Sequence, residues 1–437
     1  MQYPVAHEDF MEPKYNLGWV VRQTGLSADT IRIWEKRYGI PHPQRTDGNQ
    51  RLYSDHDVWL LNWLHEKTRQ GVQISKAVSL WQEEARLMAA EQARNTLELA
   101  PPTDETERLR QSWVQACLNL DDQASTAVLD EAFSILSQPL AARQVVFAGV
   151  KSMETMWMNG EHSSHYLHYA RQAASRKIYS LMGAYLANMQ SQGILMLATV
   201  MEEEDPFRPV YMAYIAKMAG WKAVNAGPQM IAGPLMQTIR ETSASALILV
   251  ANHLHTAANA YQLLHEIQSE LPVFYCGTFF ELHPEIRERF PGVFLQEPWE
   301  SQIIKIAGLL DQAFKYQGLP PCTDCADYLD KYQQIRLLVE QESQHAIPPA
   351  VLQDQHFAMA NYFMQRGITA AMQLGQLSYL EEDLVWIHRL ISNMGFGEQV
   401  MPAYVMTYRD AVTRLAGSEL QPLEEALTNA ANRMQNN

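Results

Sequence analysis

The chain has 437 residues, enough for two to four domains that each bury a core of their own. Hydrophobic residues make up 47% of it and charged residues 19%, which excludes a disordered or a collagen-like chain. The formal charge of 34 − 49 = −15 excludes a nucleic-acid coat or a polybasic membrane binder. The start MQYPVAHEDF has no apolar run, and no stretch reaches about 18 uninterrupted apolar residues. We therefore predict a cytoplasmic protein without a membrane partner.

The positive charge is local. Residues 1–75 carry nine Lys and Arg against nine Asp and Glu, so the rest of the chain holds the whole negative charge. Between residues 32 and 51, basic side chains outnumber the two acidic ones, Glu35 and Asp47; they are Arg32, Lys36, Arg37, Arg45 and Arg51. This excess indicates a small cationic face near the start of the chain.

The same segment predicts a helix-turn-helix followed by a wing. In YNLGWVVRQTGLSADTIRIWEKRYG, apolar residues recur at helical spacing, the pair Thr24-Gly25 interrupts them, and Ser27 can cap a second helix. RTDGNQRLYSDHDV then predicts two short strands around residues 47–49 and a helix capped by Ser54 or Asp55. The second helix would present its basic side chains to phosphates and base edges.

TIRIWEKRYGIPHPQRTDGNQRLYSDHDV resembles the winged helix-turn-helix of the MerR family, in the branch of the CarA/CarH light regulators and the curli regulator MlrA. The resemblance covers about 70 residues. It implies a homodimer or higher oligomer that reads a double-stranded DNA operator. It also implies that residues of the second helix and the wing face DNA: Thr30, Arg32, Lys36, Arg37, Tyr38, Arg51 and Tyr53.

Four further regions follow the head, which we place at residues 1–75. A helix-favouring tract ending at Pro101-Pro102 predicts a linker helix over 76–105, and apolar residues at helical spacing predict a four-helix bundle over 106–190. Short β-rich runs alternate with helical segments near 208–219, 231–243, 257–270 and 280–290. This alternation predicts a flavodoxin-like, five-stranded parallel sheet over 191–316, whose ligand would lie beyond the carboxyl ends of the strands.

A helical bundle before such a sheet, behind a MerR-type head, resembles the cobalamin-dependent regulators of the CarH type. Their W-x9-E-H motif, which covers the upper face of the corrin, appears here with Trp157 and His168, but Leu167 stands in the place of the Glu. Their D-x-H-x-x-G motif, whose His is the lower ligand of cobalt, matches Glu203, Asp205 and Arg208. Two further pocket positions match Asn252 and Gly277.

Because the cobalt-ligating His is missing, we do not expect the sheet domain to bind cobalamin as the family does. Three interpretations stay open: a structural or protein-binding module, a pocket for another ligand such as heme, another tetrapyrrole or a nucleotide, and cobalamin held without a lower protein ligand. The first two describe a degenerate sensor domain. The third keeps the alternative of a cobalamin-dependent, light-sensing regulator of the CarH type.

Two other clusters have the spacing of a metal or redox site. His162, His165 and His168 stand at successive i, i+3 steps, and neighbours at that spacing can share a metal or a heme iron. Cys322-x-x-Cys325 could form half of a zinc site or a redox pair. Ordinary surface histidines and cysteines explain both patterns as well, and we predict no metal site.

Residues 317–437 predict a separate helical domain that serves packing or oligomerisation. LEEDLVWIHRLISNMGF carries an apolar stripe typical of a core or a dimer contact. The chain has no P-loop, G-x-G-x-x-G, G-x-S-x-G or H-E-x-x-H motif. We therefore predict a transcription regulator and not an enzyme.

Overall fold

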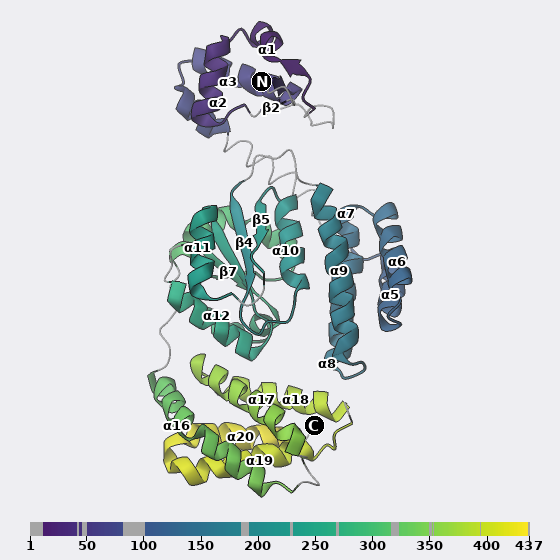
Figure 1. The fold of residues 1–437 in the computed structure, drawn as a ribbon, viewed down its shortest axis with the longest axis vertical. Helices are drawn as coiled ribbons and strands as arrows, with labels where there is room; N and C mark the ends of the chain where they lie inside the picture. The colour runs from purple at the N-terminus through teal and green to yellow at the C-terminus, as the bar shows by residue number, and fades with distance from the viewer. Residues whose placement is uncertain are drawn as a thin grey trace. The chain divides into compact units, whose positions relative to one another are not determined.

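The computed structural model describes residues 12–41, 43–45, 50–81, 101–184, 192–227, 230–267, 271–315, 323–348, 352, 354–393 and 395–435 (Figure 1). The chain forms two compact units, the N-terminal head over residues 1–92 with 187–190, and the remainder. Among the described residues, no helix is long and apolar enough to cross a membrane.

The head combines helices with a small antiparallel sheet. Its helices are α1 (Leu17–Thr24), α2 (Ala28–Tyr38) and α3 (Asp55–Arg69), and residues 74–81 are also helical. Its strands are β1 (Tyr15–Asn16), β2 (Gln44–Arg45) and β3 (Arg51–Tyr53), in the order β1-β3-β2. The predicted helix-turn-helix and wing are therefore confirmed. The predicted linker helix falls mostly on residues 82–100, which lie outside the described residues.

Capping residues fix where the helices of the head begin and end. Gly25 ends α1 at a φ of 69°, and the Ser27 side chain accepts the backbone N–H of Thr30 to start α2. Ser54 and Asp57 form a reciprocal capping box at the start of α3. These local signals separate α1 from α2 by only three residues, which is the spacing of a helix-turn-helix.

The second unit begins with the predicted four-helix bundle. Its helices are α5 (Asp104–Leu118), α6 (Asp122–Ile135), α7 (Gln138–Leu140), which continues through a π-helical segment (Ala141–Phe147) into α8 (Ala148–Met158), and α9 (Ser164–Ala184). Trp113 is fully buried in the bundle, and its indole N–H donates to Ser125 Oγ at 3.0 Å. A buried indole needs such an acceptor.

Five parallel strands follow, in the order β5-β4-β6-β7-β8. They are β4 (Ile194–Thr199), β5 (Lys222–Asn225), β6 (Ala246–Val250), β7 (Val273–Cys276) and β8 (Val293–Phe294). The crossover helices α10 (Phe207–Met218), α11 (Ala232–Thr242) and α12 (Leu254–Ile267) lie between them in sequence. This strand order is the flavodoxin-like one, so the predicted fold class is confirmed.

The fourth connection differs from the helix expected near 280–290. It consists of α13 (Thr278–Leu282) and a 3-10 turn (Pro284–Glu288). Pro284 has no backbone N–H, so an α-helix from residue 280 cannot continue across it without losing a hydrogen bond. The short helices α14 (Trp299–Ile303) and α15 (Ile306–Lys315) complete the sheet domain.

The two faces of the sheet belong to different cores. Met196 and Ala198 of β4 pack with α12 and the C-terminal helices, whereas Leu195 and Leu197 pack with α10 and the bundle. Successive side chains of a strand point to opposite faces, which explains this alternation. Nearly every residue of α10 is buried, because α9 covers the side that the sheet leaves free.

The C-terminal domain is helical, as predicted. It comprises α16 (Thr323–Ala346), α17 (Asp354–Gln373), α18 (Ser378–Asn393), α19 (Val400–Ala416), a 3-10 turn (Gly417–Leu420) and α20 (Gln421–Gln435). Leu380 and Leu384 of the apolar stripe are buried. α17 packs against α12 of the sheet domain, so the C-terminal helices share a core with one face of the sheet (Figure 1).

Candidate functional site

One face of α2 is exposed and mostly cationic. Its side chains stand at positions i, i+3, i+4, i+7 and i+8 and are all exposed; they are Asp29, Arg32, Ile33, Lys36 and Arg37. Ile31 and Trp34 on the opposite face are buried in the head's core. Arg32 lies 3.6 Å from Asp29, but both side chains are exposed, so this pair contributes little stability. The guanidinium of Arg32 therefore remains available to a ligand.

Two other predicted DNA contacts lie at the edge of this face. Thr30 is half-buried, and its hydroxyl is 2.8 Å from the hydroxyl of the capping residue Ser27. Tyr38 is half-buried beside Arg37, whose guanidinium carbon is 5.6 Å from the ring centroid. Both residues support the geometry of α2 as well as bordering its exposed face.

The wing residues require a correction. Arg51 Nε donates to both carboxylate oxygens of Glu35, at 2.8 and 3.1 Å, and so joins the wing to α2. Tyr53 is fully buried, and burial raises the pKa of its hydroxyl to about 12. Residues two apart on a strand share a face, and this face of β3 turns inward. Tyr53 therefore has no exposed surface to offer DNA, contrary to what the sequence implied. Arg51 is held by Glu35, and its predicted DNA contact stays a prediction.

At the carboxyl edge of the sheet, Asp205 is completely enclosed. Its Oδ1 accepts the backbone N–H groups of Phe207 at 2.9 Å and Arg208 at 3.3 Å, which caps α10. Its Oδ2 accepts a short hydrogen bond from Arg208 Nη1 and lies 3.6 Å from Arg171 Nη2. Burial favours the neutral acid, but Arg171 and Arg208 outweigh it and lower the pKa of Asp205 to about 2.

Glu154 of the bundle completes this buried ion network. Its Oε1 accepts from Arg171 Nη2 at 3.2 Å, and its Oε2 accepts from Arg208 Nη2 at 2.6 Å. Burial would raise the pKa of Glu154, but the two arginines lower it instead. The network contains two carboxylates and two guanidinium groups, so its charges balance. It ties α8 and α9 of the bundle to the loop before α10.

The remaining predicted sheet residues meet beside the network. Glu203 accepts from the backbone N–H of Asn252 at 2.8 Å and from its side-chain amide at 3.0 Å, and Asn252 Oδ1 accepts from Thr278 N–H at 3.2 Å. Gly277 has a φ of 133°, and a Cβ there would lie 1.9 Å from the carbonyl oxygen of Ala251. Only glycine fits this close approach. The sequence analysis thus identified residues that lie together, from three different strand ends.

C-terminal helices contact the same edge. Trp157 of α8 packs against Trp386 of α18, which also stacks with His253 after β6. Glu202 in the loop after β4 accepts from Tyr362 Oη at 3.0 Å and lies 3.5 Å from Arg366. Leu167 is buried and His168 is half-buried. Doubly wound sheets bind ligands at the carboxyl ends of their strands. In this chain, side chains of α17 and α18 contact that edge.

The described residues contain no group of three His, Cys, Asp or Glu side chains that could hold a metal ion. His162 and His165 are exposed. Cys325 is half-buried, and Cys322 lies outside the described residues. Among the described residues, the fold therefore gathers neither the histidine cluster nor the cysteine pair into a metal-binding group.

Sequence analysis missed several residues of both sites. Ile33 is 56% exposed on the α2 face, and an apolar residue outside the helix's buried stripe is the signal that could have identified it. Glu154, Arg171 and Trp386 had no local signal. Their partners lie from 17 residues away, as for Glu154 and Arg171, to more than 200 residues away, as for Trp386 and Trp157, so only the fold brings them together.

The fold of the head defines a class: α1 and α2 form a helix-turn-helix, and β2 and β3 form a wing beside it. Residues 15–84 match the family described as "MerR HTH family regulatory protein". The chain is 30% identical to the transcriptional repressor CarH of Myxococcus xanthus over 194 residues, which are 44% of this chain and 64% of CarH. It is 38% identical to the transcriptional regulator MlrA of Escherichia coli over 66 residues, 15% of this chain and 27% of MlrA. Residues 15–84 of the head are therefore similar to the MerR family.

A solved structure of a cobalamin-binding protein from Desulfitobacterium hafniense matches with a TM-score of 0.26 and 16% identity, covering 45% of this chain and 96% of that one. A TM-score of that size establishes no shared fold, so the strand order alone defines the sheet domain. The chain matches less than two thirds of the length of CarH.

Proposed function

We propose that this protein is a MerR-type transcription regulator that binds a double-stranded DNA operator as a homodimer through the exposed face of α2. The observation that carries the proposal is the cationic α2 face within residues 15–84, the segment that matches the MerR family. Arg and Lys side chains read guanine edges and neutralise phosphates, and Ile33 offers an apolar contact for a thymine methyl group. Two-fold symmetric operators fit a dimer of such heads.

The acidic remainder of the chain bears on specificity. Because the residues after position 75 hold the whole charge of −15, long-range attraction to DNA in general is weak. Binding then depends on the few cations of α2. This concentration of charge makes the proposal testable with few substitutions.

The test is a footprint on operator DNA selected from random sequence by the full chain. The double variant Arg32→Ala/Arg37→Ala should lose the footprint, since each base-edge contact contributes about 1–3 kcal/mol. A charge-matched control is Arg176→Ala/Arg414→Ala, because both arginines are exposed and lie outside the head. Selection that enriches no sequence, or a double variant that footprints like the wild type, would overturn the proposal.

We further propose that the sheet domain does not hold cobalamin. A lower ligand to cobalt must offer a free donor, but Asp205 is a carboxylate saturated by Arg171, Arg208 and two backbone N–H groups. The indole of Trp157 is covered by Trp386. These contacts support a sheet domain that is structural or serves a different ligand or partner.

The second candidate is the cobalamin-dependent, light-sensing regulator that the family resemblance implies. The 194-residue match to CarH favours it, because this length extends well beyond the DNA-binding head. The two candidates share the DNA-binding function and differ only at the sheet edge. Cofactor uptake separates them without reference to DNA.

A further inference from the structure

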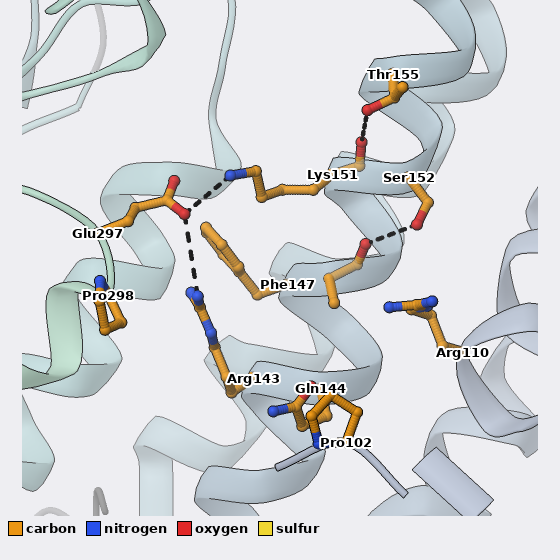
Figure 2. A pocket seen from close by; sticks show the side chains of 11 residues that line it. Pro102, Arg110, Arg143, Gln144, Phe147, Lys151, Ser152, Thr155, Glu297 and Pro298 are labelled. Carbon is orange, nitrogen blue, oxygen red and sulfur yellow. Dashed lines mark hydrogen bonds and ion pairs between the residues drawn. The ribbon is translucent and has the colours of Figure 1, made fainter. Parts of the chain in front are cut away.

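A polar pocket lies between the bundle and the loop after β8 of the sheet domain. Figure 2 shows its lining side chains, and its volume is about 470 Å³. This volume is in the range of small-molecule sites. α5, the π-helical segment, α8 and the loop after β8 supply the lining, which includes Arg110, Arg143, Phe147, Lys151, Glu297 and Pro298.

Cations outnumber carboxylates in this lining. Arg110, Arg143 and Lys151 face the pocket with Glu297 as the one acidic group, in a chain whose net charge is −15. Arg110 also pairs with Glu107 of its own helix. Figure 2 shows Arg110 approaching from the side opposite Glu297, with Phe147 between them. An anion in the pocket would thus meet cations from both sides.

The guanidinium of Arg143 lacks a close partner. It lies 4.0 Å from Glu297 and 3.9 Å from Glu300, both longer than a hydrogen bond. Among the described residues, its buried Nη1 has no hydrogen-bond acceptor. Glu300 Oε1 accepts from Tyr211, while its buried Oε2, 3.9 Å from Arg143 Nη1, is too far away to accept a hydrogen bond from it. A buried, unpaired donor of this kind costs free energy that an acceptor in the pocket would recover.

Glu297 stands where such an acceptor would lie. Its Oε2 accepts from Lys151 Nζ at 2.9 Å while facing Arg143, and both cations lie over the ring of Phe147. The Lys151 side chain is 49% exposed and the Glu297 side chain 19% exposed, so solvent reaches this pair mainly from the Lys151 side. An incoming anion can therefore exchange with Glu297 without unfolding the site.

We infer that this pocket binds a small organic or inorganic anion, with a carboxylate or phosphate group held by Arg143, Lys151 and Arg110. The anion takes the place of the Glu297 carboxylate between the two cations. Pro102 and Pro298 line the rim and contact the apolar part of an organic ligand. An effector role for the site rests on the proposed function, but binding itself does not.

Isothermal titration calorimetry on the full chain, in buffer with about 150 mM chloride, tests the inference with inorganic phosphate and with succinate as probes. Saturable binding of either probe at one site per chain is expected, and the probe that binds identifies the anion class. Lys151→Gln and Arg143→Gln should each weaken binding about tenfold, because each removes a charge-assisted hydrogen bond. Glu297→Gln should strengthen binding, because it removes the internal competitor.

Lys177→Gln is the matched control. Lys177 likewise lies over a phenylalanine ring, that of Phe133, and pairs with a carboxylate, Asp130, but it is outside the pocket. Its substitution should leave the affinity unchanged. No saturable binding of either probe, or equal losses in Lys151→Gln and Lys177→Gln, would overturn the inference. Footprinting of the same preparations reports separately on DNA binding.

Discussion

The indole of Trp386 lies edge-on against the indole of Trp157, with ring centroids 5.4 Å apart and planes at 78°. Trp386 also stacks with His253, at a centroid distance of 6.0 Å. One side chain of the C-terminal helices therefore contacts both the bundle and the carboxyl edge of the sheet. The family resemblance implies that Trp157 covers the upper face of a corrin. In this structure, Trp157 packs against Trp386 instead.

The first prediction concerns cofactor uptake. After equilibrium dialysis in the dark, the full chain should retain no stoichiometric adenosylcobalamin, because Asp205 is saturated and Trp157 is covered. The absorption spectrum of the purified protein should also lack heme or other tetrapyrrole bands. Stoichiometric, tight uptake with a light-dependent change in oligomer size would instead establish the light-sensing alternative.

A rescue variant sharpens this test. Asp205→His/Arg208→Gly restores the His and the Gly of the family motif and leaves Glu203 at its Asp position, and adding Trp386→Ala removes the side chain that contacts Trp157. Uptake by the triple variant but not by the double variant would identify the C-terminal helices as the larger obstacle. Trp59→Ala, in the core of the head, is the control for loss of an indole.

The second prediction concerns the buried ion network. Arg208→Leu should lower the free energy of unfolding by about 3–5 kcal/mol, because the two buried carboxylates of Asp205 and Glu154 are then left with Arg171 as their one cationic partner in the network. Arg176→Leu breaks only an exposed pair with Asp122 and should cost less than about 1 kcal/mol. Urea denaturation followed by circular dichroism measures both. Similar losses in the two variants would mean that the buried ion pairs contribute no more to the free energy of unfolding than an exposed pair does.

Much of this fold could be predicted from sequence, because its signals are local. Ser27, Gly25 and Ser54 mark the helix boundaries of the head, and buried apolar runs mark the parallel strands. At the sheet edge, the residues that could be predicted are those that directly follow a strand, such as Asp205 and Asn252. What the sequence did not reveal depends on long-range contacts: the inward turn of Tyr53, the pairing of Arg208 with Glu154, and the approach of Trp386 to Trp157.

The third prediction concerns the link between wing and α2. Arg51→Ala and Glu35→Gln should weaken operator binding by similar factors, and the double variant should be no weaker than either single variant. Arg51 then acts through the position that Glu35 gives it. Fluorescence anisotropy with labelled operator gives the three affinities for a double-mutant cycle. Losses that add would show instead that Arg51 contacts DNA directly.

The fourth prediction concerns pH. Burial, with Arg366 and His253 nearby, lowers the pKa of His255 to about 2. An unfolded imidazole binds a proton near pH 6.5, whereas the folded one does not, so stability falls as the pH drops below that value. This single residue should cost about 2 kcal/mol between pH 6.5 and 5. Asp383, whose pKa burial raises to about 6, acts in the opposite direction as it takes up its proton.

Comparing variants isolates the histidine. Between pH 7 and pH 5, the free energy of unfolding should fall less in His255→Gln than in the wild type. Urea unfolding at the two pH values measures this difference. His162→Gln, at an exposed position, should keep the wild-type difference. An unchanged pH dependence in His255→Gln would mean that the folded imidazole is protonated over this range.

The burial of α10 on both sides affects how the second unit opens. With the sheet on one side and α9 on the other, its amide groups reach water only when sheet and bundle separate. Hydrogen–deuterium exchange along α10 therefore reports a cooperative opening of the two layers and not a local fraying. Any signal that loosens the bundle from the sheet would first be visible as faster deuteration of this one helix.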